Sequence, residues 1–335
     1  MSKLLVTLGT TSLNSDCITK MCAFNPYVFR LNMSHVQLDD LETHIRLIQS
    51  TTSVPVCIDS EGAQIRTHAM HNGSVCLTTG DEVEFLEDLR EGTAERFSLT
   101  PAGIAGALRE GDVVRLDWHG VRIRVVSVRP RILGVVEEGG EVASRKAVDV
   151  NRELPLAAIT PKDREALRMG RDMGVTHFAL SFAGTAEALH EFRSLAGDRA
   201  TIISKIESLS ALQNLASVLQ ATDEALIDRG DLSRVVQLEK IPFLQMRIIS
   251  LANIYQTPIF VATNLLESMI QQGIPTRAEL NDVVSSLLAG ANGLVLAAES
   301  AVGQHPVGCV KTIRTLMNLC GKWTPNASLT EIMEM

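Results

Sequence analysis

The feature that most constrains this chain is a repeated alternation of short apolar segments with longer segments of helical periodicity. The apolar segments are rich in β-branched residues, which is typical of buried strands. We expect strands at 3–8, 27–31, 54–59, 177–181, 201–205, 224–228, 258–262 and 293–297. Amphipathic helices are expected at 15–24, 39–50, 161–173, 185–195, 208–219, 239–255, 279–289 and 306–320. Eight strands alternating with eight helices predict an α/β fold, the closed TIM (β/α)8 barrel.

One long interval interrupts this alternation after the third predicted strand. Helical periodicity disappears there, and alternating strands with turn signals such as Gly111-Asp112 and Gly139-Gly140 replace it. This pattern predicts a small all-β domain, inserted as a lid over the barrel mouth, and its removal leaves about 250 residues, the usual size of such a barrel. We therefore expect a barrel domain at 1–67 and 155–325, a β-barrel-like lid domain at 68–154 and a C-terminal tail at 326–335.

The amino-acid composition limits the kinds of binding partner and the cellular location to be expected. The net charge of −8 disfavours nucleic acid or an anionic membrane as the main partner. The six cysteines are scattered without the spacing of a zinc site, as in reduced cytoplasmic proteins. No apolar run approaches the length of a membrane span, and the N-terminus lacks the shape of a signal peptide. We expect a cytoplasmic protein that acts on small molecules, and a homo-oligomer is compatible with this composition.

The segment FRLNMSH, at the end of the second predicted strand, places a polar residue at every second position. Alternate residues of an extended segment point to the same side. Arg30, Asn32 and Ser34 are therefore expected to converge on one spot, with Leu31 and Met33 in the core on the other side. The alternative is a strand end that merges into an ordinary polar loop.

Charged residues also stand at or just after the carboxyl ends of other predicted strands, where TIM barrels carry their catalytic groups. The cations are Arg30, Arg66 and Lys205, and the carboxylates are Asp59, Glu207, Asp231 and Glu299. Cations alone indicate anion capture. Together with carboxylates they indicate a phosphate held with a hard divalent metal. The alternative for Lys205 and Glu207 is an exposed ion pair at a strand end.

Six segments in order resemble the successive blocks of the pyruvate kinase family. They are RLNMSH (30–35), IDSEGAQIRT (58–67), IISKIES (202–208), DRGDLS (228–233), VATNLLESMI (261–270) and PTRAELNDV (275–283). The resemblance runs in register from Leu5 to about Leu319, and the predicted lid falls where the family carries its lid domain. The chain is expected to lack the regulatory domain that usually follows. The resemblance implies Mg²⁺-dependent phosphoryl transfer between phosphoenolpyruvate and ADP, which gives pyruvate and ATP.

The resemblance also implies roles for individual residues on the phosphoenolpyruvate side of the site. Lys205 would stabilise the transferring phosphoryl group and the enolate oxygen. Glu207 and Asp231 would bind Mg²⁺ (or Mn²⁺), and the backbone N–H groups of Gly230 and Asp231 would receive the substrate carboxylate. Arg30 would hold the phosphate.

Further roles follow from the same resemblance. A potassium cage is implied for Asn32, Ser34, Asp59 and Ser60. Thr263 matches the threonine of the proton relay to the enol carbon. Arg66 and the lid residue Lys146 would face the nucleotide phosphates, with Asn32 on the same side.

The departures from the family pattern gather on the nucleotide and cation side. Glu61 stands where the family usually has a lysine, which predicts weak ADP affinity. Gln64 stands where potassium-dependent members have a glutamate and potassium-independent members a lysine, so we expect a weak, partial K⁺ dependence. A second hypothesis is therefore a pathway-specific relative that uses the enolate chemistry with another phosphoryl partner or none. A third is a non-catalytic metabolite-binding scaffold.

Overall fold

The computed structural model of the protein describes residues 2–117, 120–152 and 154–335. It divides into two compact units, the first formed by Met1–Gly62 and Ala158–Met335 and the second by Ala63–Ala157. The second unit thus begins before the predicted residue 68, because strand β4 (Arg66–Thr67) pairs with a strand of the insert, β7 (Arg96–Thr100).

The first unit contains a closed barrel of parallel strands, as predicted. Within the described residues its order is β1-β17-β16-β15-β14-β13-β3-β2. The strands are β1 (Lys3–Thr7), β2 (Val28–Asn32), β3 (Val56–Asp59), β13 (His177–Leu180), β14 (Thr201–Ile206), β15 (Glu224–Asp228), β16 (Ile259–Ala262) and β17 (Gly293–Leu296). The register pairs Asn32 of β2 with Asp59 of β3, so the polar end of β2 lies beside the acidic end of β3.

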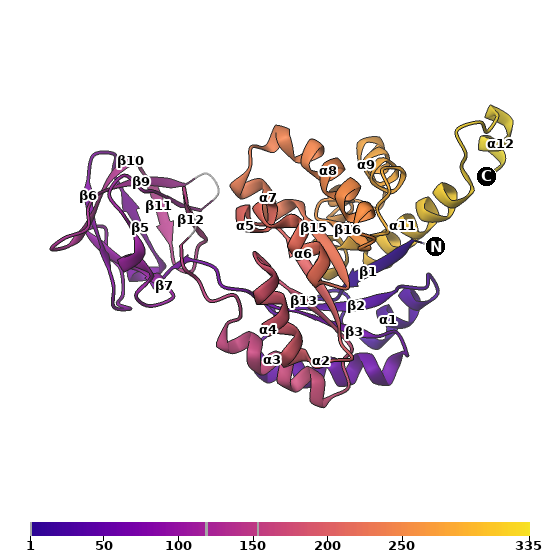
Figure 1. Ribbon diagram of the computed structural model, residues 1–335, viewed down its shortest axis with the longest axis horizontal. Coiled ribbons are helices and arrows are strands. Elements are labelled where there is room, and N and C mark those ends of the chain that lie inside the picture. The colour runs from indigo at the N-terminus through magenta and orange to yellow at the C-terminus, as the bar shows by residue number, and fades with distance from the viewer. Residues whose placement is uncertain (1, 118–119, 153) are drawn as a thin grey trace. The chain divides into compact units, whose positions relative to one another are not determined.

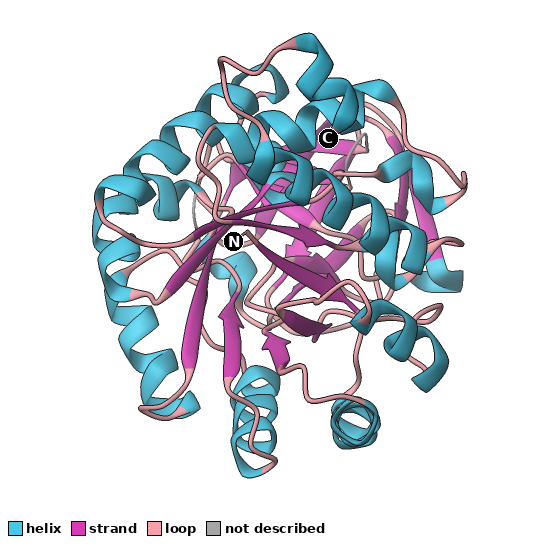
Figure 2. Ribbon diagram, turned by 90° about the vertical axis from the view of Figure 1, so that its right-hand side faces the viewer, coloured by secondary structure: helices cyan, strands magenta, loops and turns pink. Residues whose placement is uncertain are grey.

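Helices surround the barrel strands (Figures 1 and 2). They are α1 (Ser15–Cys22), α2 (Leu38–Thr51), α3 (Pro161–Asp172), α4 (Ala186–Ala196), α5 (Leu209–Gln213), α6 (Leu215–Ala221), α7 (Arg229–Val235), α8 (Ile241–Ile254), α9 (Arg277–Leu288), α10 (Ala298–Ala301) and α11 (Pro306–Lys322). The C-terminal helix α12 (Leu329–Glu334) has no buried residues and lies away from the strands in Figure 1. The short helices η3 (Leu238–Lys240) and η4 (Glu267–Ile270) add single turns. None of the helices in the described part of the chain is long and apolar enough to cross a bilayer.

The local sequence explains where several helices begin and end. Thr160 and Thr276 precede α3 and α9, and each forms a reciprocal capping box with the carboxylate three residues later. The single helix predicted at 208–219 is instead two, α5 and α6, which meet at the non-helical residue Asn214. Helix α7 was not predicted, since its seven residues are too few for helical periodicity to be recognised.

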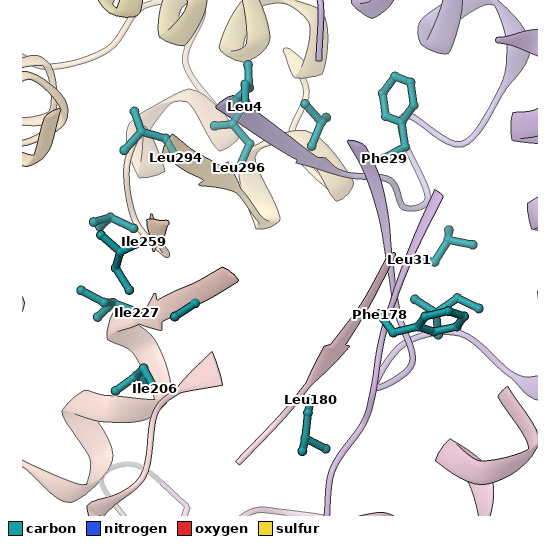
Figure 3. Packing of buried hydrophobic residues seen from close by; sticks show 14 of the residues in the cluster. Leu4, Phe29, Leu31, Phe178, Leu180, Ile206, Ile227, Ile259, Leu294 and Leu296 are labelled. Carbon is teal, nitrogen blue, oxygen red and sulfur yellow. The ribbon is translucent and has the colours of Figure 1, made fainter. Parts of the chain in front are cut away.

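Two apolar layers hold the barrel together. The side chains that point outward pack between strands and helices, as Figure 3 shows for Leu31, Phe178 and Ile227 among others. The side chains that point inward form a separate core cluster: Leu5, Val28, Cys57, Ala179, Ile203, Leu226, Phe260, Ala262 and Val295. This alternation explains β2, where the two layers bury Val28 and Phe29 on opposite sides before the polar end is reached.

The second unit is all-β with two short 3₁₀ helices, η1 (His71–Gly73) and η2 (Ile104–Ala107). Its sheet has the order β12-β8-β9-β10-β6-β7-β4, and β11 pairs with β5. The strands not yet given are β5 (Ser74–Leu77), β6 (Glu82–Leu86), β8 (Val113–Leu116), β9 (Val121–Ser127), β10 (Ile132–Glu138), β11 (Gly140–Ala143) and β12 (Val148–Val150). The unit has its own apolar core, which includes Phe85, Phe97 and Ile123. The predicted all-β insert after the third barrel strand is confirmed.

Candidate active site

Lys205, near the end of β14, is the centre of a buried charge cluster and is only 5% exposed. Its Nζ lies 3.0 Å from Oε2 of Glu207 and 3.3 Å from Oδ2 of Asp228. Oδ2 of Asp59 lies 3.8 Å away, and Nζ donates a 3.2 Å hydrogen bond to Oγ of Ser181. Burial alone would lower the pKa of Lys205, but the three carboxylates outweigh it and raise the pKa. The side chain is thus a permanent cation rather than an exposed strand-end ion pair.

Arg30 is the second buried cation of the site. Its Nη1 lies 3.3 Å from Oδ2 of Asp59, while Nε makes no hydrogen bond within the described residues. Leu31 and Met33 are fully buried in the outer core, so Arg30 points to the opposite side of β2, as its alternation predicted. A buried guanidinium with an unused donor is suited to an anionic ligand, because burial of an unsatisfied donor is costly otherwise.

Three carboxylates beside Lys205 could hold a divalent metal. One oxygen each of Glu207, Asp228 and Asp231 lies within 4.8 Å of the others. Oε1 of Glu207 accepts a 2.7 Å hydrogen bond from the N–H of Phe182, whereas the buried Oε2 makes none. Burial raises the pKa of Glu207 to about 8. Although Oε2 faces the ammonium of Lys205 at 3.0 Å, a buried carboxylate beside two further carboxylates fits a hard cation such as Mg²⁺.

Asp228 is a member of the cluster that the sequence analysis did not identify. Its Oδ1 accepts a 2.7 Å hydrogen bond from Oγ1 of Thr263, and Oδ2 faces Lys205. Burial would raise the pKa of Asp228, but Lys205, Thr263 and Arg30 outweigh it and lower the pKa. Asp228 is the last residue of β15, so the sequence signal was present. It was not predicted because the family resemblance of this segment implied roles only for Gly230 and Asp231.

Thr263 has a positive φ of 75°, which is rare for a β-branched residue. The side chain of Arg229 fixes this backbone: Nη2 and Nε donate to the carbonyl of Thr263 at 2.6 and 3.1 Å. Nη1 of Arg229 is paired in turn with Asp282 of α9 at 2.7 Å. The three residues form a clamp that determines where the Thr263 hydroxyl lies.

Glu299 does not act as a pocket carboxylate, contrary to the prediction. It is 1% exposed, and its Oε1 accepts backbone hydrogen bonds from Leu265 and Leu266. Oε2 accepts another from the N–H of Ala297. Because the loop after β16 turns its N–H groups toward this carboxylate, Glu299 supports the loop that carries Thr263.

Gly230 lies where α7 approaches Thr263 closely. A Cβ at this position would come within 2.9 Å of Cγ2 of Thr263, so only glycine fits without a shift. Gly230 and Asp231 are the second and third residues of α7, where N–H groups have no partner within the helix. This position is compatible with the binding of a carboxylate by their N–H groups, which stays a prediction from the resemblance.

The four residues of the predicted potassium cage lie at the ends of β2 and β3. Oδ1 of Asn32 accepts a 2.9 Å hydrogen bond from the N–H of Ser34. Asp59 and Ser60 are buried, and Oγ of Ser60 accepts a 2.8 Å hydrogen bond from the N–H of Ser181. The strand pairing brings Asn32 beside Asp59, but Asp59 is also shared with Arg30.

Glu61, which follows β3, is paired with a lysine. Oε2 of Glu61 lies 3.0 Å from Nζ of Lys162 in the first turn of α3, and the same ammonium donates to the carbonyl of Met33. The N–H of Glu61 donates to Asp163, the capping-box residue of this helix. The negative charge of Glu61, from which weak ADP affinity was predicted, is therefore partly neutralised.

The two cations predicted on the nucleotide side lie in the second unit. Nη2 of Arg66 donates a 2.9 Å hydrogen bond to Oε1 of Gln64, and Nη1 donates to the carbonyl of Arg145 at 3.2 Å. Nζ of Lys146 lies 3.0 Å from Oδ2 of Asp117. Arg66 and Lys146 stand on adjacent segments, since the N–H of Thr67 donates to the carbonyl of Lys146.

Comparison with known proteins identifies the family. The family described as pyruvate kinase, barrel domain, matches residues 1–310. The chain belongs to the pyruvate kinase family. A pyruvate kinase of Agrobacterium vitis is 33% identical over 324 residues, which cover 94% of this chain and 68% of that protein. A pyruvate kinase of Thermotoga maritima is 32% identical and is covered over 69% of its length.

Structural comparison agrees in fold. A crystal structure of a pyruvate kinase from Cryptosporidium parvum superposes with a TM-score of 0.88 at 24% identity, covering 97% of this chain and 70% of that chain. The predicted membership of the pyruvate kinase family is confirmed, and this membership makes the chain a phosphotransferase enzyme. The reading of the chain as a non-catalytic scaffold is therefore not supported.

Proposed function

We propose that this enzyme transfers a phosphoryl group between phosphoenolpyruvate and ADP, giving pyruvate and ATP, with Mg²⁺ as cofactor. The observation that carries the proposal is the buried cluster in which Lys205 lies 3.0 Å from Glu207 while Arg30 keeps an unused guanidinium donor. Phosphoryl transfer depends mainly on positioning and charge neutralisation, and this cluster supplies both.

Each group has a distinct task in this proposal. Glu207 and Asp231 would hold Mg²⁺ (or Mn²⁺), which when bound neutralises charge on the phosphate and substrate oxygens. Arg30 binds the phosphate, and Lys205 stabilises charge on the transferring group and on the enolate oxygen. The N–H groups of Gly230 and Asp231 bind the carboxylate.

The remaining assignments complete the proposed site. Thr263 passes the proton at the methyl carbon. Arg66 and Lys146 of the second unit bind the nucleotide phosphates. A weakly bound K⁺ is proposed for Asn32, Ser34, Asp59 and Ser60. We propose a cytoplasmic location, and the net charge of −8 supports small-molecule rather than nucleic-acid partners.

A second candidate is the same enolate chemistry with a different phosphoryl partner or none. Asp228 favours it, because this third buried carboxylate, 3.3 Å from Lys205, adds negative charge near the proposed phosphate position. Like charges at close range weaken binding by a kcal/mol or more, roughly a factor of ten in affinity.

A split assay tests the two candidates. ATP formation is measured with phosphoenolpyruvate and a panel of nucleoside diphosphates, and solvent deuterium exchange is measured at the methyl group of pyruvate with Mg²⁺ and phosphate. Both activities are expected from the first candidate, and exchange without nucleotide turnover from the second. Absence of both, in protein shown to bind Mg²⁺, would contradict the proposed function.

A further inference from the structure

Asp228 uses its two oxygens on two different groups of the site. Oδ1 accepts the 2.7 Å hydrogen bond from Oγ1 of Thr263, and Oδ2 lies 3.3 Å from Nζ of Lys205. Glu207 shares the contact with Lys205, since its Oε2 lies 3.0 Å from Nζ, but its Oε1 accepts from the N–H of Phe182 rather than from Thr263. Although Asp228 lies in the same carboxylate cluster, its contacts associate it with Thr263 and Lys205.

We propose that Asp228 is the terminal proton acceptor of a relay that acts on the substrate methyl carbon through Thr263. The inference rests on the proposed function, in which an enolisable 2-oxo acid lies beside Lys205. An ionised carboxylate only accepts hydrogen bonds, so the hydroxyl proton of Thr263 points toward Asp228. The lone pairs of Oγ1 are then left for a proton that arrives from the substrate.

The step balances as follows in the direction of enolisation. The methyl C–H bond breaks and its proton passes to Oγ1 of Thr263, while the hydroxyl's own proton moves to Oδ1 of Asp228. The C–H electron pair becomes the C2–C3 double bond, and negative charge moves to the C2 oxygen, where Lys205 stabilises it. In the direction of pyruvate formation the same protons return in the opposite order.

The geometry holds this relay in place. The distance of 2.7 Å lies within the range in which general acid–base catalysis operates. The Arg229 clamp fixes the unusual backbone of Thr263, and the absence of a side chain at Gly230 leaves room for its methyl group. The hydroxyl therefore keeps one orientation, toward Asp228.

The test is a double-mutant cycle on solvent deuterium exchange into the pyruvate methyl group, followed by proton NMR with Mg²⁺ and phosphate. Asp228→Asn is expected to slow exchange by about 10²-fold or more, the usual contribution of a general base. Thr263→Ala is expected to slow it similarly, and the double variant is expected to be no slower than either, since both act in one relay. Thr263→Ser keeps the hydroxyl and should restore most of the rate.

A matched control lies at the other end of the same strand. Glu224 begins β15, is also buried, is paired with Lys3 and accepts a 3.0 Å hydrogen bond from the hydroxyl of Tyr27. Glu224→Gln removes a comparable carboxylate far from the site, so it is expected to lower thermal stability without changing exchange. Ligand affinity is measured as well. In Asp228→Asn we expect the affinity for pyruvate to stay within about threefold of the wild type, which is less than the tenfold change that corresponds to 1.4 kcal/mol. The affinity for Mn²⁺, measured by electron paramagnetic resonance, is expected to stay within the same limit.

Three results would overturn the inference. The first is exchange at the wild-type rate in Asp228→Asn, and the second is multiplicative effects of Asp228→Asn and Thr263→Ala. The third is a loss of Mn²⁺ affinity in step with exchange, which would make Asp228 a metal ligand. Failure of the proposed function would be distinguishable, because the wild-type protein itself would then show neither exchange nor phosphoryl transfer.

Discussion

Nζ of Lys162 lies 3.0 Å from Oε2 of Glu61, so the carboxylate that stands where the family usually has a lysine carries its own counter-charge. Lys162→Met would leave Glu61 as an uncompensated negative charge. We expect the KM for ADP to rise by about three- to tenfold, because one close like charge costs up to a kcal/mol or more. Steady-state kinetics with varied ADP measures this.

The control for this prediction is the double variant Glu61→Gln/Lys162→Met, which has no charge at either position. It is expected to bind ADP at least as well as the wild type. An unchanged KM in Lys162→Met would show that Glu61 is too far from the nucleotide to matter.

Gln64 predicts the response to monovalent ions. It has neither the negative charge of a glutamate nor the cation of a lysine, so removal of K⁺ is expected to lower activity only partially. Gln64→Glu should increase the dependence. Activity assays in tetramethylammonium buffer, with and without K⁺, measure both. Complete loss of wild-type activity without K⁺ would refute this reading of Gln64.

The Arg229–Asp282 pair predicts that a substitution outside the proposed substrate site lowers kcat. Asp282→Asn removes the charge that fixes Nη1 of Arg229 at 2.7 Å and loosens the clamp on the Thr263 carbonyl. We expect kcat to fall by roughly tenfold or more with little change in KM, because a misplaced catalytic group affects the transition state more than binding. Arg229→Lys, which loses the planar fork, should behave in the same way. A change confined to KM would argue against the clamp.

Glu207 predicts a pH dependence of stability in the metal-free protein. Burial raises its pKa to about 8 from the ordinary 4.5. Between these values the folded state binds a proton that the unfolded state has lost, so the unfolding free energy should fall as pH rises, by at most about 1.4 kcal/mol per unit. Denaturant unfolding from pH 5 to 8 in a chelator measures this fall, and Glu207→Gln should lack its contribution. If the unfolding free energies of the wild type and Glu207→Gln changed with pH in the same way, the prediction would be wrong. Because a metal binds the ionised form, added Mg²⁺ should stabilise more at higher pH.

The sequence predicted the barrel because its signals are local. The apolar runs and helical segments reveal strands and helices directly, and the placement of active sites at carboxyl ends of strands then led to Lys205 and Glu207. The same rule also applies to Asp228, the last residue of its strand, but the resemblance of the DRGDLS segment implied roles only for Gly230 and Asp231, so Asp228 was not predicted.

Partners that are distant along the chain could not be predicted. Glu299 follows the carboxyl end of β17, where catalytic groups are expected, but the loop after β16 donates backbone N–H groups to its carboxylate. The sequence shows the charge of Glu61 but not its partner Lys162, which reaches it from the start of α3. In both cases the role of the carboxylate depends on contacts between segments that are far apart in sequence. Such contacts leave no periodic pattern in the sequence from which they could be predicted.

The most direct test of the central claim is phosphorus NMR of the protein with phosphoenolpyruvate, ADP and Mg²⁺. The account predicts that the phosphoenolpyruvate signal decays as the γ-phosphate signal of ATP grows in equal amount, and that a chelator stops both. Lys205→Met should slow the transfer by about 10²–10³-fold, as expected for loss of one group that stabilises developing charge. Decay of phosphoenolpyruvate to inorganic phosphate without ATP, or transfer at the wild-type rate in Lys205→Met, would contradict the account.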